Sequence, residues 1–284
     1  MDRSPTGAVD QSQVRQAPRP SKGERTGMIR WQTLRELPNE CAWTIKQRWR
    51  ASRVPLLPSG EDGRGRVGLL SPKQRARYDT LGQRYALTRL GDYLSAEQWR
   101  ENLYVLDVLD QQLGQSRVTT PGPGLEIGCR NFSYLPALYA YAAHPWHGVE
   151  LDAHARYWNG WTRAAYGRAL AARYAGSVYH ATSVTALTGS FVLIVWFLPF
   201  LNIETLIAYG LPRRYFDPPT LLSTAHRLLA PGGTLLIVNQ GAHERDAQQQ
   251  LCAALALPCT APLVIASPFS PFRIARYATL LHKP

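Results

Sequence analysis

The feature that most restricts the fold is the order of segments between residue 117 and the C-terminus. Short apolar runs typical of strands occur at 124–128, 146–152, 176–182, 191–201 and 234–240. Segments typical of helices lie between or after them, at 133–143, 155–174, 218–230 and 244–257. Strands that alternate with helices form βαβ units, which place parallel strands in one sheet with helices on both faces. The sequence therefore predicts an α/β fold.

The C-terminal residues and the longest apolar run complete this prediction. Residues 272–284, "FRIARYATLLHKP", are typical of one or two strands that close the sheet. We predict a Rossmann-like, doubly wound, mostly parallel sheet of seven strands with an N-terminal helical cap. The run 191–201 is shorter than the roughly 20 apolar residues that cross a bilayer, so it predicts a buried strand and no membrane interaction. Within the predicted helix 155–174, we expect Tyr157, Trp158 and Trp161 to pack against the sheet.

The first third of the chain has a different composition. Residues 1–27 are polar and contain hardly an apolar side chain, which predicts a disordered tail. Apolar residues resume at Met28, which suggests the hypothesis that Met28 is the true start. Residues 54–72 are typical of a loop and 73–114 of helices, with Ser95 as an N-cap and Gly114 as a terminator. We expect 28–115 to form the helical cap region and 116–284 the ligand-binding domain.

Charge and cysteine content limit the partners. The formal net charge is +12, and residues 1–100 carry 19 Lys and Arg against 10 Asp and Glu. A basic segment is compatible with nucleic acid, but a solvated face is the favoured interpretation because residues 1–100 contain no run of consecutive basic residues. The four cysteines lack the C-x2-C spacing of a zinc site, so we predict no metal and a reducing, cytoplasmic setting.

The stretch "PGPGLEIGCRNFSYLPAL", residues 121–138, has the outline of a nucleotide-binding loop. A short apolar run leads through Glu126 to Gly128, and a helix is expected after it. A second acid, Glu150, follows at the end of the next predicted strand. An acid roughly 20 positions after such a glycine is placed to bind ribose hydroxyls. In parallel sheets these residues share the carboxyl edge of the strands, which predicts a site for an adenosine-bearing ligand.

The missing glycines limit which adenosine ligand fits. Dinucleotide sites need G-x-G-x-x-G because the backbone must approach a pyrophosphate, and this loop keeps one glycine of that set. A ligand without phosphates needs less of the loop. S-adenosylmethionine combines an adenosine, a sulfonium and an amino-acid end, and it has no diphosphate.

At these residues the chain resembles the class I S-adenosylmethionine-dependent methyltransferases, with a degenerate first motif. The resemblance covers residues 117–284 and rests on "LEIGC", on "HGVELD" and on "RLLAPGGTLLIVNQG" before the fifth strand. It implies methyl transfer with S-adenosylmethionine as the cofactor. Arg130 and Phe132 stand where the family usually has further glycines. Val192 follows Phe191 where the family often has an aspartate.

The resemblance also implies roles for individual residues. Gly128 would let the turn pass close to the ligand, Glu126 would accept from its ammonium group, and Glu150 would bind the ribose. Thr182, with neighbouring Ser183, stands where the family often has an acid that binds adenine. The segment 198–202 would face the methyl group and the acceptor. We add the hypothesis that Arg130 pairs with the methionine carboxylate, a charge-assisted contact.

The expected reaction is displacement at the sulfonium methyl, which needs little acid–base machinery, so no catalytic residue is predicted. We expect a small-molecule acceptor enclosed by the cap region. The alternatives are a non-catalytic protein of the same fold that binds the cofactor or a partner, a nicotinamide-dependent oxidoreductase, and an RNA methyltransferase. The sequence does not predict the oligomeric state. Cys129, His147, His180 and His243 are expected to be packed or surface residues.

Overall fold

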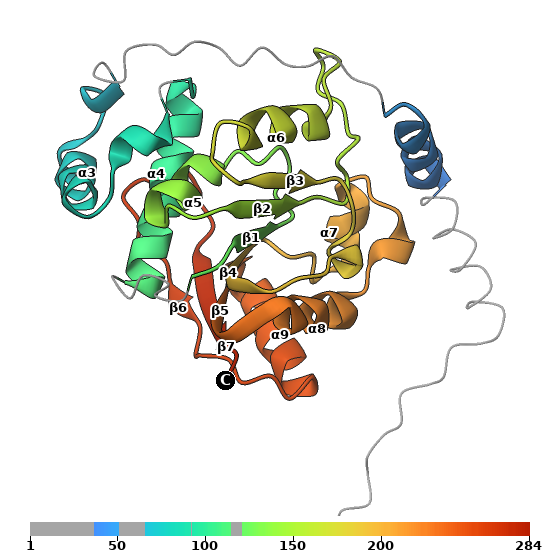
Figure 1. Cartoon of the computed structure of the whole chain (residues 1–284). Coiled ribbons are helices and arrows are strands. Elements are labelled where there is room, and N and C mark those ends of the chain that lie inside the picture. Colours follow the sequence, from blue (N-terminus) through green and yellow to red (C-terminus); the bar gives the residue numbers. More distant parts are fainter. Residues whose placement is uncertain (1–36, 51–65, 92, 115–120) are drawn as a thin grey trace, which may run out of the picture.

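The computed structural model describes residues 37–50, 66–91, 93–114 and 121–284 (Figure 1). The predicted disordered tail, the proposed start at Met28 and most of the predicted loop 54–72 lie outside these residues. The division into a cap region and a ligand-binding domain near residue 115 stays a prediction.

A seven-stranded sheet in the order β3-β2-β1-β4-β5-β7-β6 forms the centre of the molecule. Its strands are β1 (Gly124–Ile127), β2 (Trp146–Val149), β3 (Val178–His180), β4 (Phe191–Phe197), β5 (Leu229–Gln240), β6 (Leu263–Val264) and β7 (Arg276–His282). The first five strands pair in parallel, and β7 pairs antiparallel with β5 and with β6. The predicted Rossmann-like, mostly parallel sheet is therefore confirmed.

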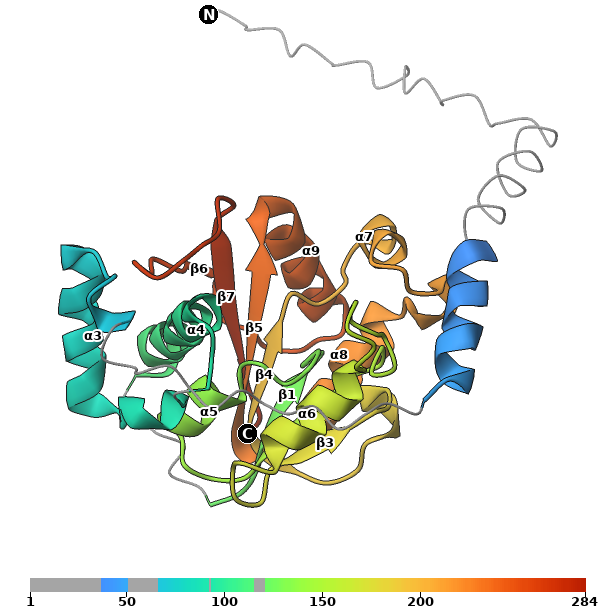
Figure 2. The ribbon, with the colours of Figure 1, turned by 90° about the horizontal axis from the view of Figure 1, so that it is seen from above.

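Helices cover both faces of the sheet, as the strand–helix alternation predicts. The helices before and between the first strands are α3 (Pro72–Arg84), α4 (Ala96–Leu113), α5 (Leu135–Tyr141) and α6 (Arg163–Ala171). Those after β4 are α7 (Ile203–Ala208), α8 (Pro218–Leu228) and α9 (Gly241–Ala254). Figure 2 shows α4 and α5 on one side of the strands and α8 and α9 on the other. Short 3-10 helices lie at Leu87–Leu90, Val184–Ala186 and Arg213–Tyr215.

Alternate strand residues divide the apolar core into two layers. Val195, Leu236 and Val238 pack with α4 and α5, whereas Ile194 and Ile237 pack with α8. Successive side chains of a strand point to opposite faces, so this alternation assigns the strand residues to the two layers, except at the register shift between Phe191 and Leu193. The layer beneath α4 and α5 is called the α4 face below.

Two predicted elements are corrected by the structure. The predicted helix 155–174 is a loop up to Thr162, whose hydroxyl accepts from the backbone N–H of Ala165 and begins α6. Gly160 has a φ of 81°, a value that a regular helix does not contain, and Trp158 is 99% exposed. The expectation that Trp158 packs on the sheet is wrong. The second closing strand is β6, outside the predicted segment 272–284.

Helix α4 begins and ends where the sequence predicts. Ser95 accepts from the backbone N–H of Gln98 while the Gln98 side chain accepts from the N–H of Ser95, and Gly114 follows the last turn. An equivalent capping box, Ser71 with Gln74, starts α3. Such reciprocal caps satisfy backbone donors that a helix start leaves unpaired.

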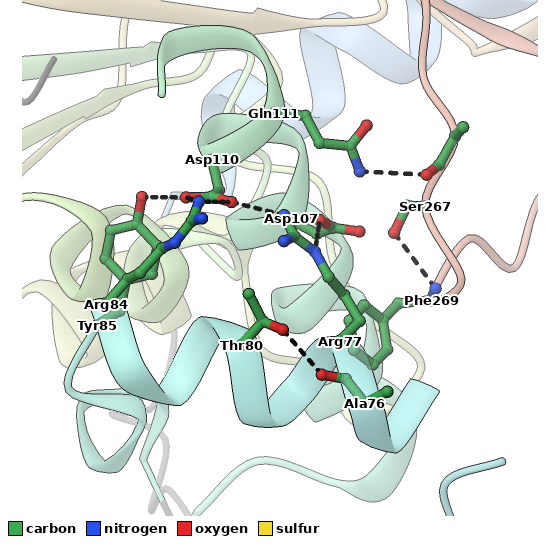
Figure 3. Close-up of polar contacts among 11 residues, drawn as sticks. Ala76, Arg77, Thr80, Arg84, Tyr85, Asp107, Asp110, Gln111, Ser267 and Phe269 are labelled. Atoms are coloured by element: carbon green, nitrogen blue, oxygen red, sulfur yellow. Dashed lines mark hydrogen bonds and ion pairs between the residues drawn. The ribbon is translucent and has the colours of Figure 1, made fainter. Parts of the chain in front are cut away.

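Ion pairs between α3 and α4 hold the two helices together (Figure 3). Arg77 donates to Asp107 at 2.7 Å and to Asp110 at 2.6 Å, and Arg84 and the Tyr85 hydroxyl also donate to Asp110. Burial alone would raise the pKa of Asp110, but these hydrogen bonds outweigh it and the pKa is lowered. The Asp107 side chain is fully buried, and Arg77 forms its ion pair.

We expect Arg77→Met to lower the free energy of unfolding by about 3–5 kcal/mol, because it leaves the buried carboxylate of Asp107 without its cation and leaves Asp110 with Arg84 as its remaining cation. Arg75→Met is the control, since Arg75 forms an exposed pair with Asp79 on the same helix and should change stability by less than about 0.5 kcal/mol. Urea unfolding measures both. Equal effects of the two variants would contradict the role assigned to Arg77.

The helix at residues 37–48 lies beside α7, at the other end of the molecule from α3 (Figure 1). Its Trp43 is buried against Leu206 and Leu211, and its Asn39 donates to the carbonyls of Ile207 and Leu211. The described helices of the cap region therefore occupy two separate places. In the described part of the chain, no helix has both the length and the apolarity needed to cross a membrane.

Candidate functional site

The carboxyl ends of β1, β2, β4 and β5 and the start of β7 share one edge of the sheet. At this edge the α4 face carries polar or aromatic side chains in these strands or directly after them: Glu126, Glu150, Phe197, Gln240 and Arg276. Glu126 is paired with Gly148, two residues before Glu150, and Gln240 is paired with Arg276. Because open parallel sheets bind ligands beyond the carboxyl ends of their strands, this row is the candidate site.

The loop after β1 keeps the backbone of a glycine-rich turn. Gly128 has a φ of 70°, and a Cβ built on it would meet no atom within 4 Å. Its N–H and that of Cys129 both donate to the carbonyl of Val149, so the loop lies against the end of β2. A ligand can therefore approach the backbone at Gly128 closely.

Arg130 and Phe132 adopt the conformation of the glycines that the sequence lacks. Their φ values are 52° and 63°, in the left-handed region that side chains with a Cβ rarely occupy. Leu198, just after β4 at the same edge, also has a positive φ of 56°. Left-handed residues of this kind cost roughly 1–3 kcal/mol each and gather at functional sites.

Arg130→Gly is expected to be more stable than Arg130→Ala by about 1 kcal/mol, because only glycine relieves the left-handed backbone. Both variants remove the guanidinium. If Arg130 pairs with a ligand carboxylate, both should lose about tenfold or more in S-adenosylhomocysteine affinity. Urea unfolding and calorimetry measure the two effects separately. An alanine variant as stable as the glycine variant would contradict the strain, and unchanged affinity in both would remove the ion pair.

The side chain of Phe132 lies in the core. It is fully buried, and it tilts against Tyr179 with ring centroids 6.3 Å apart. A Cβ on Gly148 would come within 2.9 Å of the Phe132 ring and 2.8 Å of the Cys129 sulfur. Phe132 thus replaces a glycine of the motif by filling the space above Gly148. Cys129 is a packed residue, as predicted, and burial raises the pKa of its thiol.

Glu150 fixes the first loop with its carboxylate. One oxygen, Oε2, accepts from the backbone N–H of Arg130 at 2.8 Å, and Oε1 accepts from that of Asp152 at 2.7 Å. The hydroxyl of Tyr179 donates to the Arg130 carbonyl at 2.6 Å and holds the loop from its other side. Burial raises the pKa of Glu150, although the Arg163 guanidinium, 3.8 Å away, opposes this.

Glu126 is the buried carboxyl beside it. The side chain is 2% exposed, and its Oε2 has no hydrogen-bond partner among the described residues. Burial raises its pKa well above the usual value, the charge of Glu150 raises it further, and Arg130 opposes both. An unpaired buried carboxyl lowers the stability of the folded protein unless a cationic ligand binds it. The Arg130 side chain itself is exposed and also interacts electrostatically with Glu101 of α4.

The remaining predicted residues lie nearby without a demonstrated role. Thr182 is half-buried in the bend that follows β3. His147 and His180 stack on each other with ring nitrogens 3.0 Å apart, and burial lowers the pKa of both. They belong to the face opposite the α4 face, because His147 is paired with Leu125 and His180 with Val149. The roles predicted for Glu126, Gly128, Arg130, Glu150 and Thr182 stay predictions.

Sequence reasoning missed Arg276 and Tyr104. Arg276 starts β7 and is 7% exposed, and Tyr104 of α4 is 4% exposed. The available signal was the alternation in "RYATL", where Arg276 shares one strand face with Ala278 and Leu280. A charged residue on an apolar strand face is informative because such burial is rare without a partner.

No protein-family model matches this sequence, and no curated protein matches it either. Solved structures with a similar fold include the N-methyltransferase NodS from Bradyrhizobium japonicum WM9, with 15% identity, 65% of this chain and 99% of that chain covered, and a TM-score of 0.43. They also include geranyl diphosphate C-methyltransferase from Streptomyces coelicolor A3(2), with 13% identity, coverage of 69% and 86%, and a TM-score of 0.43.

A third is the plantazolicin methyltransferase BpumL, with 11% identity, coverage of 78% and 95%, and a TM-score of 0.42. All three are named as methyltransferases. The ligand of this chain is therefore inferred from its own site residues.

Proposed function

We propose that this protein is an S-adenosylmethionine-dependent methyltransferase that acts on a small molecule. The observation that carries the proposal is the pair of carboxyls, Glu126 and Glu150, at the tips of β1 and β2 beside the left-handed turn at Gly128. One acid has a free buried oxygen, and the other is held rigidly by backbone donors.

The site residues fit the parts of the cofactor. Glu126 would bind the ammonium group, which would give its unpartnered Oε2 a cation. Each oxygen of Glu150 accepts one backbone hydrogen bond, and a carboxylate oxygen has two lone pairs, so it can also accept from a ribose hydroxyl. Gly128 leaves room for close approach.

A nicotinamide dinucleotide fits less well. A pyrophosphate needs free backbone N–H groups, and those of Gly128, Cys129 and Arg130 already donate to Val149 and Glu150. Two buried carboxyls would also repel the phosphates. These contacts favour an adenosine ligand without phosphates, in agreement with the missing glycines.

S-adenosylmethionine, when bound, supplies an electrophilic methyl group, so the protein has to bind and align rather than activate. Glu126 and Glu150 would fix the two ends of the cofactor, and the residues after β4, from Leu198, would border the acceptor. Burial raises the pKa of Tyr104 to about 12, so its phenol stays protonated at neutral pH, can donate a hydrogen bond to a ligand and does not act as a base. Alignment alone can contribute about 7–11 kcal/mol.

A small-molecule acceptor is favoured because the polar groups on the acceptor side are enclosed. Arg276, which is paired with Gln240 at the end of β5, is buried on the α4 face, and neither its Nε nor its Nη1 has a hydrogen-bond partner among the described residues. Buried groups of this kind bind a ligand that enters the fold rather than one that stays on the surface.

Calorimetry with S-adenosylhomocysteine tests the proposal. We expect micromolar binding of this ligand and no heat of binding with NAD or NADP. Mass spectrometry of ligand that remains bound through purification gives an independent readout. Failure of S-adenosylhomocysteine to bind would overturn the proposed cofactor. Binding without methyl transfer to any small molecule of the cell extract would favour the non-catalytic alternative.

A further inference from the structure

Arg276 is a buried cation for which the described residues supply no ion pair and no hydrogen bond. Its Nε and Nη1 atoms are buried and have no hydrogen-bond partner among the described residues. The guanidinium lies over the ring of Phe272, 4.2 Å from its centroid. Glu244, an acid that interacts electrostatically with Arg276, already accepts from the backbone N–H of Gln240 through Oε2.

Tyr104 adds a second unused donor at the same place. Its hydroxyl is buried without a hydrogen-bond partner in the described part of the chain, and its ring meets Phe272 edge-on at 5.3 Å. Arg276 and Tyr104 therefore share Phe272 as a common support, one from β7 and one from α4. Tyr134, in the loop after β1, interacts electrostatically with both.

This arrangement is unfavourable for the folded protein alone. A buried charge without hydrogen bonds loses the free energy of its hydration, and a cation–π contact recovers only part of that free energy. Groups of this kind are typical of ligand sites, where the missing partner belongs to the ligand. Guanidinium and phenol donors together match a carboxylate, which accepts through two oxygens.

The position of Arg276 separates it from the cofactor end of the site. The strands β4 and β5 lie between β1 and β7, so about 14 Å separates Glu126 from Arg276 across the sheet at a strand spacing of about 4.8 Å. Arg276 is also displaced along β7 from Leu280, the residue in register with Glu126, so the two backbones are further apart than that. The amino and carboxyl groups of an amino acid share one carbon. A cofactor whose ammonium binds Glu126 therefore leaves Arg276 to another molecule.

We propose that Arg276 and Tyr104 bind a carboxylate group of the methyl acceptor, which makes the substrate a small carboxylic acid. This inference rests on the proposed function, because it assigns the acceptor of that reaction. It names a specificity-determining pair and leaves the cofactor contacts unchanged.

The experiment compares benzoate with its neutral isostere benzamide, by calorimetry and ligand-observed NMR, on the full chain saturated with S-adenosylhomocysteine. We expect benzoate to bind at least about tenfold more tightly than benzamide, since a charge-assisted contact contributes that much. Arg276→Met should abolish the difference without changing the S-adenosylhomocysteine affinity. The same variant should raise the melting temperature by a few degrees, about what removal of an unsatisfied buried charge gives.

Arg245→Met is the matched control. Arg245 lies over the ring of Tyr277, 4.8 Å from its centroid, but its guanidinium is paired with Asp246. It should leave benzoate binding unchanged. Tyr104→Phe keeps the ring contact with Phe272 and should weaken benzoate binding by about three- to tenfold.

Several results would overturn the inference. They are equal binding of benzoate and benzamide, no benzoate binding at about 10 mM, unchanged benzoate binding in a folded Arg276→Met variant, and a loss of S-adenosylhomocysteine affinity in that variant. If S-adenosylhomocysteine does not bind the wild type, the proposed function fails instead. The benzoate comparison on the protein alone then still tests whether Arg276 binds a carboxylate.

Discussion

Replacing Glu150 with alanine is expected to weaken S-adenosylhomocysteine binding by at least about 100-fold. Two ribose hydrogen bonds to a charged acceptor contribute about 1.5–3 kcal/mol each, and 1.4 kcal/mol corresponds to a factor of ten. The total loss of affinity should exceed the contribution of these two hydrogen bonds. Without the carboxylate, the backbone N–H groups of Arg130 and Asp152 lose their acceptor, and the first loop is no longer held in its ligand-binding geometry.

The same change should destabilise the protein, since an unsatisfied buried donor costs about 1–3 kcal/mol. Asp152→Asn is the matched control. It removes a carboxylate two residues away whose oxygens accept from Lys46 and Arg163, so it should alter stability but change ligand affinity by less than about threefold. Calorimetry and urea unfolding on both variants separate the two effects. A Glu150→Ala variant that keeps its affinity while folded would remove Glu150 from the site.

Much of the fold was predictable because its signals are local. The alternation of apolar runs and helical segments predicted the order of strands and helices, and Ser95 and Gly114 predicted both ends of α4. Each of these signals depends on a few neighbouring residues and on the period of side-chain burial. The pairing of β7 between β5 and β6 depends on distant contacts, which no local pattern records.

The wrong predictions also have local causes. The segment 155–174 is rich in alanine and aromatic residues, which favours a helix, but Asn159 and Gly160 form a turn in which the Asn159 side chain accepts from the N–H of Trp161. The turn signal was present and was outweighed by composition. The strand β6 contains only Leu263 and Val264, both exposed, so it has no burial pattern to detect.

The candidate site was predictable only in part. The sequence indicated Glu126, Gly128 and Glu150 because their spacing follows from the strand–turn–helix geometry of one βαβ unit. Arg276 comes from the other end of the chain and reaches the edge through the antiparallel β7. Its importance depends on partners that are missing, and a missing hydrogen bond is visible only in three dimensions. The left-handed backbone of Arg130 and Phe132 likewise contradicts what their side chains predict.

Glu126→Gln is expected to make the protein more stable and to weaken cofactor binding. Glutamine keeps the shape of the side chain but removes a carboxyl whose ionisation burial opposes, which should raise the free energy of unfolding by about 1–4 kcal/mol at neutral pH. Loss of the contact between Glu126 and the ammonium group should weaken S-adenosylhomocysteine binding by about tenfold or more. Opposite signs for stability and affinity are typical of residues retained for function.

The pH dependence of stability distinguishes this explanation from a packing effect. Burial raises the pKa of Glu126 above its usual 4.5, so above that pH the folded state binds more protons than the unfolded state. The stability of the wild type should therefore fall as the pH rises from about 4.5 through the raised pKa, and the advantage of Glu126→Gln should grow over the same range. Glu101→Gln is the control, because Glu101 also lies near Arg130 but is only half-buried.

Ligand binding should reverse the protonation of Glu126. A bound ammonium group favours the ionised carboxylate, so cofactor binding should release up to about one proton in the pH range where free Glu126 is protonated. Calorimetry in two buffers with different ionisation enthalpies measures this release directly. Glu126→Gln should abolish it, whereas Glu101→Gln should keep it. Proton release that is unchanged in Glu126→Gln would place the ammonium group on another residue and would leave the raised pKa of Glu126 as a cost of packing alone.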